Sequence, residues 1–315
     1  MTRVASITVT FNSAPRIVEH LRILLAQTRK IDEIIVVDNA STDGTAEIVA
    51  SQFPSVRVLN VGHNMAVGAY AIGMQYACEH GFDWVWTFDD DSRPSCSALA
   101  ELLSGYEQAS SRGGKVGLIA PLAVNGVTGQ PYPLWHWQNG LRPVLPEVAA
   151  REFVDVDMAI SSGSLIRTEA IRVAGLPRAD YFIDWVDFEH CLRLREHGFR
   201  VVIAMRCSMR HFIGKHQAGG KSERYVHSPF REYYQMRNLA HFVWHIRPHP
   251  RAKAYVLWHM TIQMAWDFAF NTQKLYRARL LCVGLRDGIC GRLGFRFGPT
   301  RTACTRDLKG VNRAD

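Results

Sequence analysis

Three adjacent carboxylates, Asp89, Asp90 and Asp91, follow the apolar run 83–88 and form the strongest chemical signal in the chain. Neighbouring like charges repel, so the triplet is unfavourable unless a cation or strong donors neutralise it. Residues two apart in an extended segment point to the same side, which lets Asp89 and Asp91 share a hard cation such as Mg²⁺ or Mn²⁺. The alternative is a solvated acidic turn.

A second acidic cluster surrounds Trp185 at the start of a predicted amphipathic helix over 187–197. Asp187 is a candidate general base, and the neighbouring carboxylates of Asp184 and Glu189 are expected to raise its pKa. We expect Trp185, Asp184 and Glu189 to contact an acceptor, since indole faces stack on sugars. The alternative is that these acidic residues only stabilise the helix N-terminus through its dipole.

Two further side chains could complete such a site. His211 can add a neutral imidazole to a metal that two carboxylates leave under-coordinated, although a lone histidine is more often structural. Asp38 ends the apolar run 33–38, where its carboxylate could bind a base or a ribose. The alternative for Asp38 is a helix cap, and Asp43 is the better candidate for that role.

Strands and helices alternate through the first 91 residues. This order predicts a parallel sheet with right-handed crossovers, in which ligands bind beyond the carboxyl ends of the strands. Thr10, Asp38 and Asp89 all lie at such ends. The expected strands are 4–10, 33–38, 56–60 and 83–88, and the expected helices are 16–27, 45–53 and 66–80.

The rest of the chain is less regular. Residues 121–146 have no clear pattern, and the chain from 229 is mostly helical, with expected breaks at 245–250 and after Gly284. The remaining expected elements are helices at 99–110, 167–174 and 187–197 and strands at 116–120, 199–204 and 207–211.

Composition places the chain among ordinary globular proteins, because 47% of its 315 residues are hydrophobic and 21% are charged. The net charge is +8, and residues 221–315 alone hold 17 basic and 6 acidic residues. Such a basic region predicts a polyanionic partner, either a membrane leaflet or nucleic acid. The seven cysteines are scattered without a Cys-x-x-Cys pair, which favours a reducing, cytoplasmic location. No clean apolar run of about 20 residues is present to span a bilayer.

Four motifs occur in an order that resembles the inverting GT-A glycosyltransferases of family 2. They are Thr8-Val9-Thr10-Phe11-Asn12, the run from Val36 to Gly44, the run from Gly62 to Gly68, and Phe88-Asp89-Asp90-Asp91-Ser92-Arg93-Pro94. Segments 160–165, 182–193, 210–214 and 227–238 resemble bacterial rhamnosyltransferases of the lipopolysaccharide or rhamnolipid type. Mycobacterial galactofuranosyltransferases are similar around Asp187 and His211.

This resemblance implies an α/β fold of the GT-A class, Rossmann-like, with a mostly parallel sheet flanked by helices and a C-terminal helical extension. The implied catalytic domain is 1–228, with a nucleotide-sugar half at about 1–95 and an acceptor half at about 96–228. A helical region follows at 229–297, and 298–315 is expected to be a disordered basic tail.

The resemblance also implies residues that bind a nucleotide-sugar donor. Thr10 and Asp38 would hold the nucleotide, and Asn64 and Gly68 would border the diphosphate or ribose. Asp89 would contact the ribose or the sugar.

For the metal and the chemistry, the resemblance implies Asp91 as the main ligand of Mg²⁺ or Mn²⁺, with Asp89 and His211 in the same shell. Asp187 falls on the position of the catalytic base. The middle residue of the triplet, Asp90, is usually unconstrained.

The expected activity is inverting, metal-dependent transfer of L-rhamnose from dTDP-L-rhamnose to a saccharide or glycolipid acceptor. Galactofuranosyl or other hexosyl transfer from a UDP-sugar is the alternative. Two alternatives belong to other functional classes. One is a nucleic-acid-binding or nucleotidyl-transfer protein, which the basic pI and the paired carboxylates suggest, and the other is a non-catalytic, lectin-like relic. The C-terminal helices, with basic residues that include Arg277, Arg279 and Arg286, are expected to bind an anionic membrane surface on the inner face of the cell membrane rather than nucleic acid. Packing of their apolar faces against the catalytic domain or a second subunit is the alternative.

Overall fold

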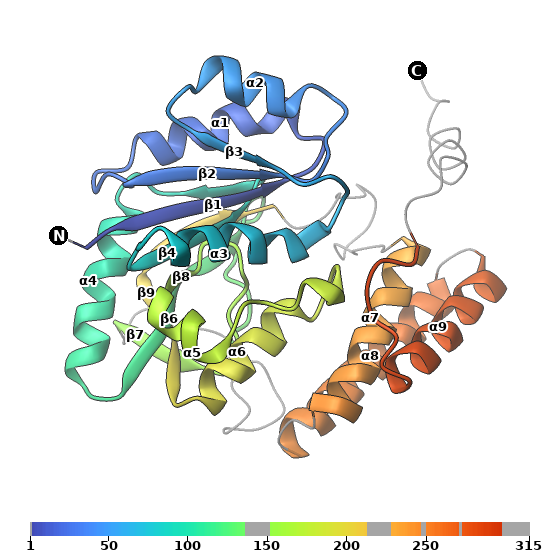
Figure 1. The fold of residues 1–315 in the computed structure, drawn as a ribbon. Helices are drawn as coiled ribbons and strands as arrows, with labels where there is room; N and C mark the ends of the chain where they lie inside the picture. The colour runs from blue at the N-terminus through green and yellow to red at the C-terminus, as the bar shows by residue number, and fades with distance from the viewer. Residues whose placement is uncertain (1, 136–151, 213–227, 247–249, 271–272, 298–315) are drawn as a thin grey trace.

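The N-terminal half of the chain folds as the alternation of strands and helices predicts. The computed structural model describes residues 2–135, 152–212, 228–246, 250–270 and 273–297 (Figure 1). Its first four strands are parallel, in the order β3-β2-β1-β4. These elements are β1 Val4–Thr10, α1 Ala14–Leu25, β2 Glu33–Asp38, α2 Thr45–Gln52, β3 Arg57–Asn60, the short helix η1 Ala66–Ala69, α3 Tyr70–Glu79 and β4 Trp84–Asp89.

The sheet continues from β4 in the order β8-β6-β9-β5, with β7 also paired to β9. Only β6 and β9 pair in parallel here, whereas β8, β5 and β7 pair with their neighbours in antiparallel fashion, so the complete sheet is mixed. The elements are β5 Ser92–Pro94, α4 Ala98–Ser111, β6 Lys115–Asn125, β7 Phe153–Val156, β8 Leu165–Arg167, α5 Thr168–Ala174, η3 Ala179–Tyr181, α6 Val186–Glu196 and β9 Phe199–His211.

Several sequence predictions for this half were wrong in detail. The run 199–211 is one strand rather than two, because β9 continues past Met205 where its register to β6 shifts. The strand predicted at 116–120 extends to Asn125. Strands β5, β7 and β8 were not predicted, since each is only three or four residues long and carries no extended alternation.

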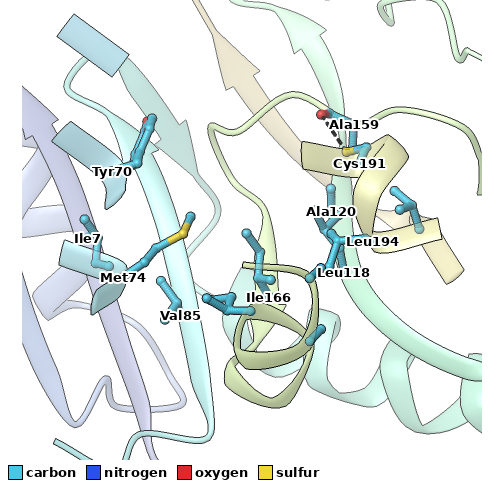
Figure 2. Close-up of a cluster of buried hydrophobic side chains, with 14 of the residues drawn as sticks. Ile7, Tyr70, Met74, Val85, Leu118, Ala120, Ala159, Ile166, Cys191 and Leu194 are labelled. Carbon is cyan, nitrogen blue, oxygen red and sulfur yellow. Dashed lines mark hydrogen bonds between the residues drawn. The ribbon is translucent and has the colours of Figure 1, made fainter. Parts of the chain in front are cut away.

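Both faces of the sheet are covered by helices, which creates two apolar layers. Helices α1, α2 and α4 pack on one face, and α3, α5 and α6 pack on the other. Figure 2 shows part of the second layer, where Met74 of α3, Ile166 of β8 and Leu194 of α6 line the sheet. The strands are thereby fixed from both sides, and their ends form a rigid edge.

The C-terminal helices lie at one side of the sheet and pack on one another (Figure 1). They are α7 Pro229–His241, the π-helical turn η4 Phe242–Ile246, α8 Pro250–Phe270 and α9 Lys274–Ile289. The predicted break after Gly284 was wrong: α9 runs through this residue, whose missing side chain lets α7 approach. A Cβ atom there would lie 2.6 Å from the carbonyl oxygen of Tyr233. The predicted tail 298–315 lies outside the described residues.

None of the helices in the described ranges is both long and apolar enough to cross a membrane.

Candidate active site

The carboxyl ends of three adjacent strands bring the predicted donor-side residues to one edge. In the register of β1 with its neighbours, Thr10 pairs with Asp38 and Val9 pairs with Asp89. Parallel strands end at the same edge of a sheet, which explains why residues far apart in sequence meet here.

Asp89, Asp91 and His211 form a cluster with the geometry of a metal site. One ligand atom from each residue lies within 4.8 Å of the others. The Nε2 atom of His211 is 3.9 Å from Asp89 Oδ2, and its Nδ1 atom is 3.6 Å from Asp91 Oδ1. The short strand β5 explains this proximity, because it begins directly after Asp91 and pairs Ser92 with His211.

The state of these side chains fits a hard divalent cation. Asp91 Oδ1 is buried and accepts no hydrogen bond from any part of the chain that is described. Burial raises the pKa of both Asp89 and Asp91, and nearby carboxylates add to the effect. Two carboxylates and an imidazole are suitable ligands for Mg²⁺ or Mn²⁺, and a bound cation would relieve their repulsion.

Ser92 orients the imidazole of His211. Its hydroxyl lies 2.9 Å from Nδ1 of the buried ring. This hydrogen bond leaves Nε2 facing Asp89, and such outer contacts commonly fix the ligating nitrogen of a histidine.

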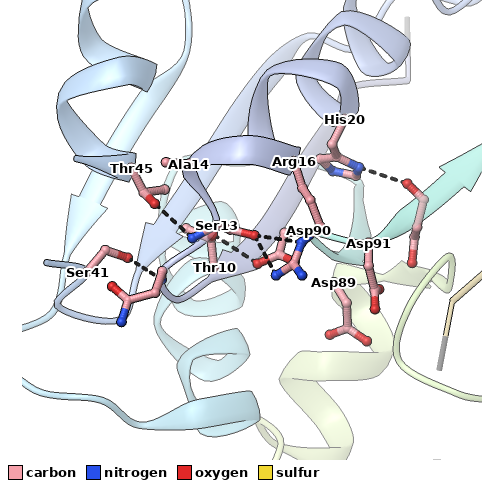
Figure 3. Close-up of polar contacts among 12 residues, drawn as sticks. Thr10, Ser13, Ala14, Arg16, His20, Ser41, Thr45, Asp89, Asp90 and Asp91 are labelled. Atoms are coloured by element: carbon pink, nitrogen blue, oxygen red, sulfur yellow. Dashed lines mark hydrogen bonds and ion pairs between the residues drawn. The ribbon is translucent and has the colours of Figure 1, made fainter. Parts of the chain in front are cut away.

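Asp90 is turned away from the cluster. Its carboxylate accepts a hydrogen bond from the Thr10 hydroxyl (3.0 Å) and lies 3.2 Å from the Arg16 guanidinium. Figure 3 shows Asp90 beside Arg16, with Asp89 and Asp91 pointing to a common side away from it. The charge of the middle carboxylate is therefore balanced within the fold. Thr10 lies at the strand end, as predicted, and its hydroxyl also holds Asp90 away from the cluster.

Asp187 lies in the first turn of α6 and shares the electrostatic environment of the cluster. Burial raises the pKa of its carboxyl to about 6, against a hydrogen bond from the Ser161 hydroxyl that lowers it. The charges of Asp89 and then Asp184 raise this pKa further. The pKa of Asp187 is thus raised, as the sequence predicts. The carboxylates that raise it are Asp89 and Asp184, rather than Asp184 and Glu189 as expected.

The segment Ser161–Ser164 joins Asp187 to the metal cluster. Ser161 bonds Asp187, and the adjacent Ser162 hydroxyl accepts a hydrogen bond from the Asp89 backbone N–H (2.9 Å). Ser162 Oγ also lies 2.5 Å from Ser92 Oγ, which in turn bonds His211. Two adjacent residues therefore contact the two parts of the site, Ser161 through Asp187 and Ser162 through Asp89 and Ser92, and the backbone between them links the base candidate to the cluster.

Tyr70 connects α3 to the same site. Its hydroxyl donates a 2.8 Å hydrogen bond to Asp89 Oδ1. Burial, followed by the charges of Asp89, Asp187 and Asp91, raises its pKa well above the ordinary value. The phenol therefore remains protonated and acts as a donor among carboxylates.

The three predicted acceptor-side residues are placed differently from one another. Glu189 is buried, and both its oxygens bond the Arg193 guanidinium at 2.6 and 2.8 Å, so it is engaged within the fold. Asp184 is partly exposed and holds Arg231 through two hydrogen bonds of 2.9 and 2.8 Å. Trp185 is half-buried against Phe188 and Phe242.

Among the other residues predicted to bind the donor, Asp38 has a carboxylate oxygen that is available to a ligand. Its Oδ2 atom accepts the Ser41 N–H, while Oδ1 is buried with no hydrogen-bond partner among the residues described. Asn64 bonds the Ala66 N–H through its side-chain oxygen and so shapes the turn before η1. Gly68 packs against η3, where an added Cβ would lie 2.8 Å from the Ala179 carbonyl oxygen.

Sequence reasoning assigned no role to Tyr70, Ser92, Ser161 and Ser162. For the two serines of 161–162, the available signal was their motif within the resemblance. Ser92 directly follows the acidic triplet, but its pairing with His211 depends on a strand too short to predict. Nothing in the sequence around Tyr70 distinguishes it from a core aromatic residue.

Comparisons with known proteins agree with this geometry. The chain is similar to the dTDP-rhamnosyl transferase RfbF of Shigella flexneri, with 26% identity over 74% of this chain and 77% of that protein. It is similar to the galactofuranosyltransferase GlfT1 of Mycobacterium tuberculosis, with 27% identity over 75% of this chain and 80% of that protein. The solved structure of Staphylococcus aureus TarS 1–349 in complex with UDP-GlcNAc shares the fold, with a TM-score of 0.59 at 18% identity over 91% of this chain and 80% of that one.

The family model described as glycosyl transferase family 2 matches residues 6–171, the region that holds the strand ends, the acidic triplet and the serine segment. The predicted GT-A-like α/β fold is confirmed. The chain therefore belongs to glycosyl transferase family 2 and is a glycosyltransferase.

Proposed function

We propose that this enzyme transfers L-rhamnose from dTDP-L-rhamnose, with inversion at the anomeric carbon, to a saccharide or glycolipid acceptor. The observation that carries the proposal is the placement of Asp187 in one electrostatic site with Asp89, Asp91 and His211. The rhamnosyl donor is supported by the similarity to the dTDP-rhamnosyl transferase RfbF of Shigella flexneri.

In the proposed mechanism, Asp187 acts as the base. The acceptor oxygen forms a bond to the anomeric carbon while the bond from that carbon to the diphosphate oxygen breaks, and the hydroxyl proton passes to Asp187. A carboxyl with a pKa of about 6 is ionised at neutral pH. Because this pKa is close to neutral pH, the carboxylate can accept the proton efficiently. Asp38 would receive a hydroxyl or a base N–H of the nucleoside on its unpartnered oxygen.

Asp89, Asp91 and His211 would hold Mg²⁺ or Mn²⁺, which supplies Lewis-acid stabilisation of the charge on the leaving diphosphate.

A donor panel tests the proposal. The enzyme would be incubated with dTDP-L-rhamnose, UDP-galactofuranose and other UDP-hexoses, each with Mn²⁺ or Mg²⁺, and release of the nucleoside diphosphate measured. We expect metal-dependent turnover to be fastest with dTDP-L-rhamnose. Preference for UDP-galactofuranose would replace the rhamnosyl donor, an outcome motivated by the comparable identity to GlfT1. Family membership leaves no observation in favour of the nucleotidyl-transfer alternative.

We also propose that the C-terminal helices dock on an anionic membrane surface. Along α8, Leu257, Trp258 and Ile262 are exposed, and Leu275 at the start of α9 is 89% exposed. The exposed cations Lys253 of α8 and Arg279 of α9 accompany these apolar residues, as expected for helices lying in an anionic interface. Arg277, which we expected to face lipid, is instead buried and paired with Glu232.

Vesicle co-sedimentation tests this docking. We expect binding to vesicles that contain phosphatidylglycerol but not to pure phosphatidylcholine, with weakening by salt and in a Lys253→Gln/Arg279→Gln double variant of two exposed cations. Arg277→Gln is not a suitable probe, because it breaks a buried ion pair. Equal behaviour on both vesicle types, or concentration-dependent self-association without vesicle binding, would contradict docking on an anionic membrane.

A further inference from the structure

The segment that leads into α6 has an unfavourable backbone. Phe182, Asp184 and Trp185 all have positive φ values, of 65°, 62° and 68°. This left-handed region is disfavoured for residues other than glycine, so such conformations persist only where the surrounding structure holds them. The strained residues end two positions before Asp187.

Asn238 of α7 is placed to hold this segment. Its side-chain nitrogen lies 2.9 Å from the carbonyl oxygen of Tyr181, 2.8 Å from that of Ile183 and 3.0 Å from that of Asp184. The side chain is fully buried. Three carbonyls from one short segment therefore converge on a single amide, and the backbone can do this only by turning around it.

Two arginines of α7 complete the contact. Arg237 is fully buried, supports the Asn238 side-chain oxygen through Nε (2.9 Å), and donates to the carbonyls of Asp180 and Tyr181 at 3.1 and 2.8 Å. Arg231, two helical turns before Asn238, holds the carboxylate of Asp184. The segment is thus bound through both its backbone and its side chain.

Asp187 depends on the same segment. The first hydrogen bond of α6 runs from the Glu189 N–H to the Trp185 carbonyl (3.0 Å), so the strained residues fix where the helix begins. The start of the helix then sets the reach of Asp187 to Ser161 and the depth of its burial.

We propose that Asn238 is a positioning residue for Asp187, so that this side chain of α7 serves the reaction as well as the packing of the C-terminal helices. The proposal rests on the base role of Asp187 under the proposed function. Asn238 itself touches neither donor nor acceptor in this assignment.

The test is a double-mutant cycle measured with whichever donor the panel shows to turn over. We expect Asn238→Ala to lower the transfer rate constant by about 100-fold, the scale for a misplaced reacting group, while the calorimetric affinity for the nucleoside diphosphate with Mn²⁺ stays within about twofold. In an Asp187→Asn background, Asn238→Ala should cost little more, because residues that act as a unit are not additive.

Tyr234→Phe is the matched control. Tyr234 is another buried residue of α7, and its hydroxyl bonds the Phe297 backbone rather than the strained segment. We expect this variant to lose thermal stability but to keep its transfer rate. If Asn238→Ala does not fold, Arg231→Met replaces it in the cycle. The Arg231 side chain is partly exposed, so its loss should be tolerated, and the variant releases the carboxylate of Asp184.

Additive losses, or equal losses of donor affinity and transfer rate, would overturn the positioning role. Failure of the proposed function is distinguished separately: wild-type transfer by the single Asp187→Asn variant would refute the base assignment itself.

Discussion

The metal cluster and the base candidate face one site but are built by different means. The ligands of the cluster sit on strand ends of the central sheet, and the pairing of β5 with β9 places them. Asp187 instead follows a strained segment that depends on side chains of α7, which come about fifty residues later in the chain. Strand register fixes one side of the site, whereas long-range polar contacts hold the other.

The largest expected effect is on the base. Asp187→Asn should slow transfer by about 10²–10⁴-fold and leave donor affinity nearly unchanged, because only the proton acceptor is removed. Transfer kinetics with saturating donor and calorimetry on the same preparation measure the two quantities. Glu189→Gln is the control: it weakens the pair with Arg193, so it should lower thermal stability while transfer continues. A dead Glu189→Gln with an active Asp187→Asn would reverse the assignment within α6.

The cluster side is tested by two neighbours in the acidic triplet. Asp91→Ala should abolish metal-dependent binding of the nucleoside diphosphate, since it removes a ligand with an unpartnered oxygen. Asp90→Asn should keep that binding, because Asp90 bonds Thr10 and Arg16 outside the cluster. Calorimetry with dTDP and Mn²⁺ compares them, and equal behaviour of the two variants would mean that the cluster does not hold the metal.

A smaller effect is expected for the residue that orients His211. Ser92→Ala should lower the affinity for Mn²⁺ by about 10–100-fold, the usual scale for losing an outer contact of a metal ligand. A Mn²⁺ titration followed by electron paramagnetic resonance measures this affinity. An unchanged affinity would show that strand register alone orients the imidazole.

The smallest expected effect is a shift in pH dependence. Transfer requires Asp187 ionised, so its rate should fall below a midpoint near pH 6. Asp184→Asn removes a negative charge that raises the pKa of Asp187, so the midpoint should move to lower pH. The maximal rate should also fall, because the variant weakens the contact with Arg231, but the midpoint is measured independently of that rate. The pH profile of the rate at saturating donor measures it. A midpoint that moves upward would mean that Asp184 does not act on Asp187 through its charge.

The contrast between the two sides also explains what could be predicted. Asp38, Asp89 and Asp91 end apolar runs, so the local pattern and the rule for parallel strands were sufficient to place them. The position of Glu189 depends on α6 packing against α5 and β9, and that of Trp185 on Phe242 of η4, and no local pattern encodes this packing. Glu189 was grouped with the base because it is close in sequence, but one helical turn directs it to Arg193.

The C-terminal region shows the same limit. Gly284 was interpreted as a break, although its lack of a side chain serves the close contact of α9 with Tyr233 of α7. Which apolar residues of α8 are exposed and which, like Val256, are buried was not predicted, and the burial of Arg277 likewise depends on Glu232 in another helix. Charge counted along a sequence does not reveal which cations are already neutralised.

The contacts of Gly294 have a consequence for the order in which the enzyme is made. Its N–H bonds the Asp180 carbonyl at 2.7 Å, and its own carbonyl accepts the Arg237 guanidinium. A chain still growing on the ribosome can complete its central sheet, and with it the ligand cluster, long before residue 294 has been synthesised. The support of the segment before Asp187 is finished only when this last stretch folds back, so we expect newly made enzyme to position Asp187 only after the cluster of Asp89, Asp91 and His211 has formed.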